Sequence, residues 1–167
     1  MYAIKVELKL NNSEKTLMNR HLGFSRFCYN YALSIYNQLD HKQYKGGSSK
    51  KIDLIKKIFT NVTKKNPDFA WTKEMSSRVY QNAFRALKSA FSRHWKGLGG
   101  KPKFKKKKHP GSFTLDSSNG VILQEGGHQI KLPTLGLFRT TESIPIGRFS
   151  NLYGVEKRRS LLRLFCH

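Results

Sequence analysis

The sequence is poor in acidic side chains. Ten Asp and Glu stand against 32 Lys and Arg in 167 residues, which gives a formal net charge of +22 at pH 7. The acids are dispersed along the chain, whereas metal-dependent phosphodiester cleavage needs several carboxylates that converge on Mg²⁺. No spacing of Ser, His and Asp indicates a hydrolytic triad, and the sequence has no GxxxxGK[ST] phosphate-binding loop. We therefore expect no catalytic site, no cofactor and no small-molecule substrate.

Cysteine is also scarce. Cys28 falls within an apolar helical pattern and Cys166 is the penultimate residue, so no CxxC pair points to zinc. The six histidines are scattered without metal-ligand spacing. The chain has no apolar run of about 18 residues that would predict a membrane helix, and its start alternates like a strand instead of forming the apolar core of a signal peptide. These absences predict a cytoplasmic protein without a metal site or a membrane partner.

Positive charge is what the sequence has in excess, on a chain that is 38% apolar and 12% aromatic. That composition is sufficient for a folded core, so wholesale disorder is not expected. A compact domain with this charge repels itself unless it meets a polyanion. With membranes disfavoured, the predicted partners are DNA and RNA. Nothing in the sequence indicates the oligomeric state.

Hydrophobic spacing predicts the first elements. Alternating residues predict a strand over 2–10, and three- and four-residue spacing predicts a helix over 13–38 whose start is marked by Asn11 and Glu14. Gly23 marks either close packing or a break in this helix. Aromatic residues at helical spacing favour a core over a base-stacking platform, and they are Phe24, Phe27, Tyr29 and Tyr31.

Two further helices and several strands follow. Ser49 is the expected cap of a second helix, with Asp53 near its positive end, and Asn66-Pro67 ends that region. The clearest pattern predicts a third helix over about 73–96. Short strands, separated by Gly, Asn and Pro turns, are expected at 112–115, 121–124, 129–132 and 136–140.

The order of one strand, three helices and several strands predicts the α+β class. A lone first strand needs partners, and the late strands are the candidates. We therefore expect a small β-barrel or curled sheet, built from the first and last segments, with a helical unit inserted between them. The predicted organisation is a first barrel strand at 1–10, a helical lobe at 11–99, a basic loop with the remaining strands at 100–144, and a tail at 145–167.

A run of lysines follows the third helix, in the segment KPKFKKKKHPGSF at 101–113. Lysine suits phosphate, and neutralising several phosphates releases counterions and so supplies sequence-independent affinity. The lysines concerned are Lys101, Lys103, Lys105, Lys106, Lys107 and Lys108. The alternative is a solvated linker. Phe104 makes a linker less attractive, because an aromatic among lysines can stack on a base or anchor the segment to the barrel.

The polar face of the predicted third helix is the second candidate site. Arg78, Gln81, Arg85 and Lys88 fall at i, i+3, i+7 and i+10, and so share one face. Arg and Gln side chains can pair bidentately with guanine and adenine edges. A solvated helix face explains the same pattern equally well.

Several separated motifs in this order resemble one family. They are LGFSRFCYNYAL at 22–33, QNAFRALKSAFSRHW at 81–95, GKPKFKKKK and SFTL within 100–115, and IKLPTLGLFRT at 130–140. Together they resemble the N-terminal half of TnpB-type proteins, also called OrfB transposases, over about residues 2–142. The resemblance implies a wedge-like, OB-like split β-barrel interrupted by a helical recognition lobe, with an opening segment described as a helix-turn-helix.

The resemblance also implies a function. In the family this half grips a guide RNA and reads a short transposon-adjacent DNA motif, while a RuvC-like nuclease and a zinc ribbon follow. Neither of those has matching residues in this sequence, so the expected activity is nucleic-acid binding without cleavage. By position, the motif-reading residues would be Ser77, Arg78, Gln81, Thr114 and Leu115, and the lysine run would hold backbone phosphates. Gln81 and Thr114 keep a family-like residue type, whereas Ser77, Arg78 and Leu115 are less typical.

The resemblance stops after about Ile144. Residues 145–167 read as a basic tail, like a frame-shifted read-through, and we expect the barrel to lack closing strands and to expose an edge. A melting temperature below about 60 °C would agree with that expectation. Two alternatives stay open at this point: a repressor-like protein that binds a specific DNA sequence, and an unstable pseudogene fragment.

Overall fold

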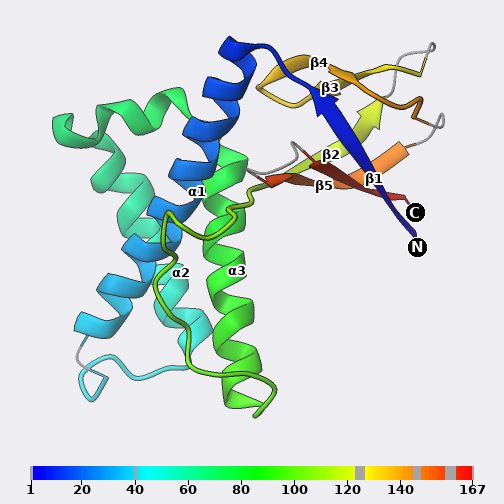
Figure 1. Cartoon of the computed structure of the whole chain (residues 1–167). Helices are drawn as coiled ribbons and strands as arrows, with labels where there is room; N and C mark the ends of the chain where they lie inside the picture. The colour runs from blue at the N-terminus through cyan, green and yellow to red at the C-terminus, as the bar shows by residue number, and fades with distance from the viewer. Residues whose placement is uncertain (1, 40, 123–126, 145–147, 157–160, 167) are drawn as a thin grey trace. The chain divides into compact units, whose positions relative to one another are not determined.

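The computed structural model describes residues 2–39, 41–122, 127–144, 148–156 and 161–166. The fold mixes helices and an antiparallel sheet, as the α+β prediction requires. Contacts divide the chain into a sheet unit, Met1–Gly23 with Lys107–His167, and a helical unit, Phe24–Lys106 (Figure 1). The boundary between the units therefore falls inside the first helix and inside the lysine run, instead of at residues 10 and 99.

The first strand and the first helix follow the sequence pattern closely. Strand β1 is Tyr2–Lys9, and helix α1 is Asn12–Gln38. The Asn11 backbone N–H donates to Glu14 Oε2, and the Glu14 N–H donates to Asn11 Oδ1, each at 2.8 Å. This reciprocal capping box confirms the predicted helix start, because it satisfies two N–H groups that have no partner within the helix. Helix α1 runs through Gly23 without a break.

The described residues form a sheet of six strands in the order β2-β5-β6-β1-β4-β3, and every neighbouring pair is antiparallel. The strands after β1 are β2 Thr114–Ile122, β3 Gln129–Leu132, β4 Gly136–Thr140, β5 Arg148–Glu156 and β6 Leu161–Cys166. The predicted strands at 129–132 and 136–140 are confirmed. The strands expected at 112–115 and 121–124 are one strand, β2, with a register shift between Asp116 and Val121. Positions 123 and 124 lie outside the described residues.

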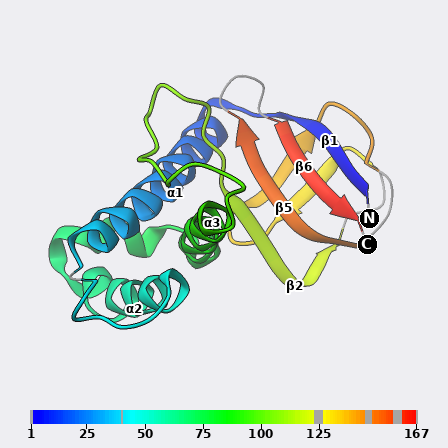
Figure 2. The ribbon, with the colours of Figure 1, turned by 90° about the horizontal axis from the view of Figure 1, so that it is seen from below.

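The predicted tail contributes two strands to the middle of the sheet. Figure 2 shows β5, β6 and β1 side by side. Strand β6 pairs with β1 from Tyr2 opposite Cys166 to Glu7 opposite Leu161, and β5 pairs with both β2 and β6. The expectation that the sheet lacks closing strands after residue 144 is therefore wrong. The segment LLRLFC is apolar apart from Arg163, and such a short apolar run can pair as a strand whatever its origin.

The core of the sheet unit is built from the N-terminal residues of the chain and from residues 113–144. Its buried apolar side chains include Val6, Leu8, Met18, Leu22, Phe113, Leu115, Ile130, Leu132, Phe138 and Ile144. The start of α1 belongs to this core, because the His21 ring lies 5.7 Å from the Phe113 ring, centroid to centroid. The two-residue alternation of β1 and the helical spacing of α1 thus bury one face of each element in the same core.

The helical unit contains α2, Ser48–Asn61, and α3, Ser77–Trp95, joined by short 3₁₀ helices at Thr63–Lys65 and Pro67–Glu74. Helix α2 begins one residue before the predicted cap, with Gly47 in the cap position, so Ser49 is not the cap. Helix α3 begins at 77, not 73. Asn66 caps the preceding 3₁₀ helix by accepting from the Asp68 N–H, and Met75 is extended, which ends that helix before α3 starts.

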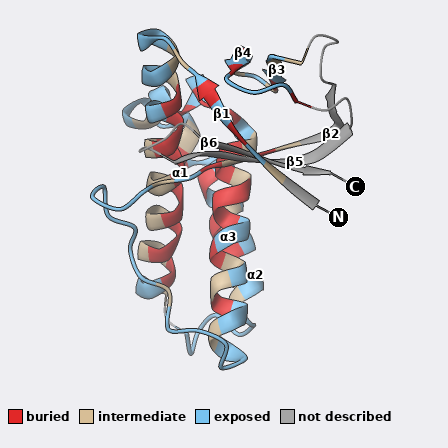
Figure 3. Ribbon diagram, turned by 45° about the vertical axis from the view of Figure 1, so that its right-hand side comes forward, coloured by how far each residue is buried: buried red, intermediate tan, exposed pale blue. Residues whose placement is uncertain are grey.

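Aromatic side chains hold the three helices together. The Phe59 ring of α2 lies 5.3 Å from Tyr31 of α1, and 5.3 Å and 5.6 Å from Tyr80 and Phe84 of α3. Farther along, Tyr36 of α1 lies 4.2 Å from Phe91 of α3. Figure 3 shows buried residues running along both α1 and α3. The aromatic residues of α1 are therefore mainly core, as their spacing predicts.

One buried titratable group makes the stability of the sheet unit depend on pH. His21 is only 3% exposed, and burial lowers its pKa, although a hydrogen bond with the Leu17 carbonyl, 2.9 Å from Nδ1, partly offsets this. The unfolded chain takes up a proton near the ordinary histidine pKa of about 6.5, where folded His21 stays neutral. The unfolded state then binds more protons, so the free energy of unfolding should decrease as the pH falls below about 6.5 and level off below the folded-state pKa.

We expect His21→Gln to flatten this pH dependence, measured by urea unfolding between about pH 7.5 and pH 5. His94→Gln, at a half-buried position in the helical unit, is the control and should keep the slope. An unchanged slope in His21→Gln would assign the pH dependence to other groups.

Candidate nucleic-acid interface

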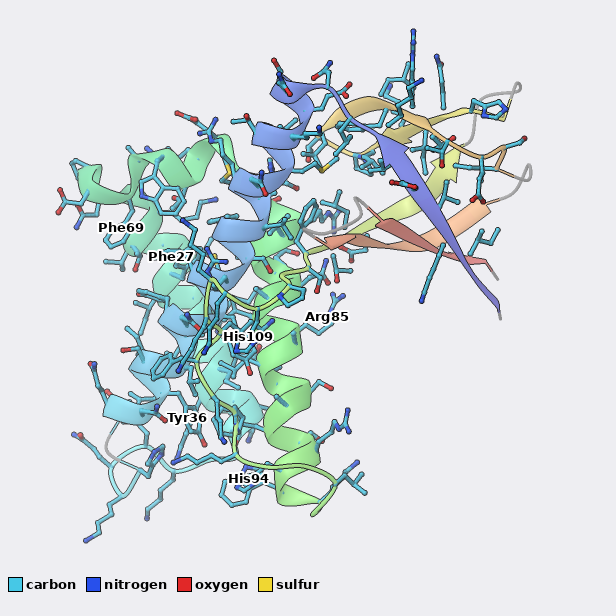
Figure 4. All side chains as sticks on the ribbon, viewed as in Figure 1. Phe27, Tyr36, Phe69, Arg85, His94 and His109 are labelled. Atoms are coloured by element: carbon cyan, nitrogen blue, oxygen red, sulfur yellow. The ribbon has the colours of Figure 1, made fainter. Side chains whose placement is uncertain are left out.

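Helix α3 presents one apolar and one polar face. Its buried side chains are Val79, Tyr80, Asn82, Ala83, Phe84, Leu87 and Phe91. The predicted base-reading residues lie elsewhere on the helix: Ser77 and Arg85 are exposed, and Arg78, Gln81 and Lys88 are half-buried. Figure 4 shows Arg85 projecting from the helix. The five side chains are thus accessible from one element, as the helical spacing predicts.

Two of these five side chains have partners within the helical unit. Arg85 Nη1 donates to Asn82 Oδ1 at 2.7 Å. Lys88 Nζ forms an ion pair with Asp53 Oδ1 at 2.6 Å, and both side chains are partly exposed. Asp53 therefore pairs with α3 and does not sit in the first turn of α2, contrary to the prediction. Because an exposed pair of this kind contributes only about 0–1 kcal/mol, phosphate can compete for Lys88.

Thr114 and Leu115 belong to the sheet unit, on β2, whereas the α3 residues belong to the helical unit. Thr114 is half-buried. Leu115 is 1% exposed, so its side chain packs in the sheet core and cannot contact a base. The alternation of β2 explains the difference, because adjacent residues of a strand point to opposite faces.

The lysine run is fixed to α1 at its midpoint. Asn30 Nδ2 donates to the Lys105 carbonyl at 2.9 Å, and Asn30 Oδ1 accepts from the Lys105 N–H at 2.8 Å. One amide side chain thus satisfies both backbone polar groups of one residue, 75 positions away in the sequence. The solvated-linker alternative predicts no such anchor. We call residues 101–108 the lysine segment.

The Lys105 side chain takes part in the same contact. Its Nζ lies 4.3 Å from the centroid of the buried Tyr29 ring, in cation–π geometry. The residue as a whole is exposed, but neighbouring atoms partly desolvate the ammonium, and this lowers the pKa of Lys105. Burial raises the pKa of the Tyr29 phenol. Lys105 therefore serves to anchor the segment, whereas the other lysines of the lysine segment are exposed.

Phe104 separates two of the lysines and is 51% exposed. Sequence reasoning leaves this residue either as an anchor or as a base-stacking group. Asn30 and Tyr29 anchor the segment at the next residue, so Phe104 is left on the surface. An exposed phenyl ring between lysines is the combination that single-strand binding proteins use for base stacking and phosphate contact.

Asn30 and Tyr29 are the functional residues that sequence reasoning missed. Asn30 sits in the run FCYNY, where a polar residue interrupts an aromatic stripe in a helix. An amide side chain there can compete with the helix backbone for hydrogen bonds. Its presence therefore indicates a hydrogen-bond partner outside the helix. That signal indicates a contact, but it does not identify Lys105 as the partner.

We also searched the described residues for a metal site, a reactive thiol and a membrane helix. There, no group of three or more His, Cys, Asp and Glu side chains is arranged to hold a metal ion. Burial raises the pKa of the Cys28 thiol. None of the helices in the described part of the chain is long and apolar enough to cross a membrane.

A comparison with protein families matches the N-terminal segment that contains Tyr29 and Asn30. Residues 1–45 match the family model of the OrfB helix-turn-helix domain of the IS605 group, described as "Helix-turn-helix domain". The chain carries an N-terminal OrfB-type helix-turn-helix domain. The match indicates DNA binding in a transposase-related protein. A comparison with curated proteins found no match.

The OrfB-type domain consists of β1 and α1 with the residues that follow α1. In this chain α1 is one continuous helix of 27 residues, so the matched segment is a strand and a single long helix. Both anchor residues, Tyr29 and Asn30, lie on α1. The OrfB-type domain therefore also positions the lysine segment, which lies outside the matched residues.

We expect Asn30→Ala to release the lysine segment. Both hydrogen bonds to Lys105 are lost, at a cost of about 1–3 kcal/mol, and trypsin should cut within 101–108 faster than in the unchanged protein. The control is Asn19→Ala, at an exposed position of the same helix. Equal cleavage rates in Asn30→Ala and in the unchanged protein would mean that the segment is not held by Asn30.

Proposed function

We propose that the chain binds guide RNA and transposon-adjacent DNA in the cytoplasm, as the N-terminal part of a TnpB-type protein, and that by itself it does not cut nucleic acid. The observation that carries the proposal is the anchored lysine segment. A chain with a net charge of +22 holds a row of exposed lysines in one fixed path, with an exposed phenyl ring between them.

The lysine segment supplies the sequence-independent part of binding. Each phosphate that it neutralises releases counterions, which makes the affinity depend steeply on salt. Because the Asn30 contact fixes the backbone at Lys105, less conformational entropy is lost when a phosphodiester chain binds. Guide RNA is the proposed occupant of the segment, since continuous single-stranded or structured RNA offers many phosphates.

The polar face of α3 supplies the sequence-dependent part. We propose that Ser77, Arg78, Gln81, Arg85 and Lys88 contact the DNA motif from α3, with Arg78, Gln81 and Arg85 at base edges. Thr114, on β2 of the sheet unit, is a separate proposed contact with the DNA motif. The Arg85 contact with Asn82 orients the guanidinium, and fixed side chains discriminate bases better than mobile ones. This face also favours the second candidate, a repressor-like protein that binds one DNA sequence.

The finer architecture belongs to the same proposal. Strands β2 and β3 are the two edge strands of the sheet, yet they contact each other. We propose that the sheet curls into a split, OB-like barrel, an architecture that binds oligonucleotides on its surface.

The salt dependence of binding tests the role of the lysine segment. In the variant Lys103→Ala, Lys106→Ala, Lys108→Ala, we expect the slope of log affinity against log salt to fall by about three, roughly one for each lost phosphate contact. The control replaces three exposed lysines elsewhere, Lys50, Lys57 and Lys65, with Ala. An equal change in the two variants would mean that only total charge matters.

The proposed ligand is tested with RNA encoded at the 3′ end of the same element, against a scrambled RNA of equal length. We expect the cognate RNA to be preferred and its binding to survive about 200 mM salt, where purely electrostatic binding falls steeply. Equal, salt-labile binding of both RNAs would refute guide recognition. Incubation of the same complexes with Mg²⁺ and labelled target DNA should give no cleavage product.

A selection from random DNA tests the α3 face. We expect Gln81→Ala to relax the preference at one base pair, by about 1–3 kcal/mol if the contact is bidentate. Lys73→Ala, at an exposed residue just before α3, should leave the preference unchanged. A strong DNA preference combined with no RNA preference would favour the repressor-like candidate over guide binding.

A further inference from the structure

A cleft of about 730 Å³ lies within the helical unit, between the end of α1, the start of α2 and the end of α3. Tyr36, His41, Ser48, Lys51, Trp95 and Lys101 are among its lining residues. Figure 4 labels Tyr36 and His94 in this region. The volume is in the range that holds a small organic ligand. Neither the predicted base-reading face nor the base-stacking Phe104 is part of the cleft.

Trp95 forms an exposed but oriented wall of the cleft. Trp95 is 67% exposed, although tryptophan is highly buried on average. The indole is nevertheless fixed at its edge, because Nε1 donates to Ser48 Oγ at 2.8 Å and Ser48 Oγ is hydrogen-bonded to the Tyr36 hydroxyl at 2.9 Å. His94 contacts the ring at a tilt of 50°. A tryptophan held by its edge offers a ring face to an incoming flat group.

The electrostatics of the cleft favour an anion beside that flat group. Two lysines line the cleft, and none of its lining residues is acidic. Lys51 Nζ lies 3.0 Å from His41 Nδ1, within hydrogen-bond distance of the imidazole, and this contact holds the ammonium at the cleft. Lys101 is also the first residue of the lysine segment, so a phosphodiester chain held by that segment passes the cleft.

We propose that the cleft receives one unpaired base of the bound nucleic acid. The base stacks on Trp95, while Lys51 and Lys101 bind the phosphates on either side of it. This inference rests on the proposed function, because the lysine segment must first hold the strand. It adds a recognition step that distinguishes an unpaired nucleotide from a duplex, whose bases are stacked inside.

Tryptophan fluorescence tests the proposal directly, because the chain has two tryptophans, Trp71 and Trp95. Trp71→Phe keeps an aromatic ring beside Phe27 and leaves Trp95 as the reporter. The probes are RNA and DNA oligonucleotides of about twelve nucleotides, each single-stranded, as a duplex, or with every base removed. We expect the single strands with bases to quench Trp95, and the duplex and the abasic strand to bind with little quenching.

Variants separate stacking from charge. We expect Trp95→Leu to weaken single-strand binding about tenfold and duplex binding hardly at all. Lys51→Ala should weaken single-strand binding more than Lys50→Ala, which removes the same charge at the adjacent, exposed position. Circular dichroism verifies that each variant keeps its helices.

The outcomes distinguish this inference from the function on which it rests. If every probe binds but Trp95 responds equally to strands with and without bases, the cleft does not receive a base and the inference is overturned. If no probe binds, the proposed nucleic-acid binding itself fails. Quenching by RNA alone would assign the base to guide RNA, and quenching by both single strands would leave the cleft open to DNA as well.

Discussion

The contact of Phe59 with rings from two other helices is the interaction on which the helical unit depends. Helices α1, α2 and α3 carry 11 of the chain's 32 Lys and Arg, and that charge opposes their close approach. Each aromatic pair adds about 0.5–1.5 kcal/mol beyond the area it buries, and Phe59 makes three. Contacts between these aromatic rings thus offset the repulsion between Lys and Arg side chains on the helix surfaces. A bound polyanion would reduce that repulsion further.

Order in the lysine segment follows from that core. Asn30 and Tyr29 are presented by α1 at a fixed position because α1 is held against α2 and α3 by its rings. Their contacts fix the backbone of the lysine segment at Lys105, so the lysines beside it are held near α1. The ordering cost of the segment is therefore met by folding, before any ligand arrives.

What the sequence predicts well is local. The capping box of α1 lies within four residues, the strand β1 alternates along eight, and the polar face of α3 follows from helical geometry. The predictions that failed depend on contacts between distant residues. Asn30 hydrogen-bonds to a backbone 75 residues away, and Leu115 is buried in the core of the sheet unit. Residues 161–166 do not resemble the family, yet a short apolar run can pair with an open strand edge.

The pairing of β1 with β6 has a consequence for the order in which the molecule is assembled. Strand β1 is synthesised long before its partner β6, with Tyr2 opposite Cys166. At about 5–20 residues per second, β1 waits on the order of ten seconds for β6. The helical unit is contiguous from Phe24 to Lys106, so all of its residues are synthesised before β6. The helices and the first part of the lysine segment are therefore synthesised while the sheet still lacks β6, so a nascent chain can meet its nucleic acid before β6 exists.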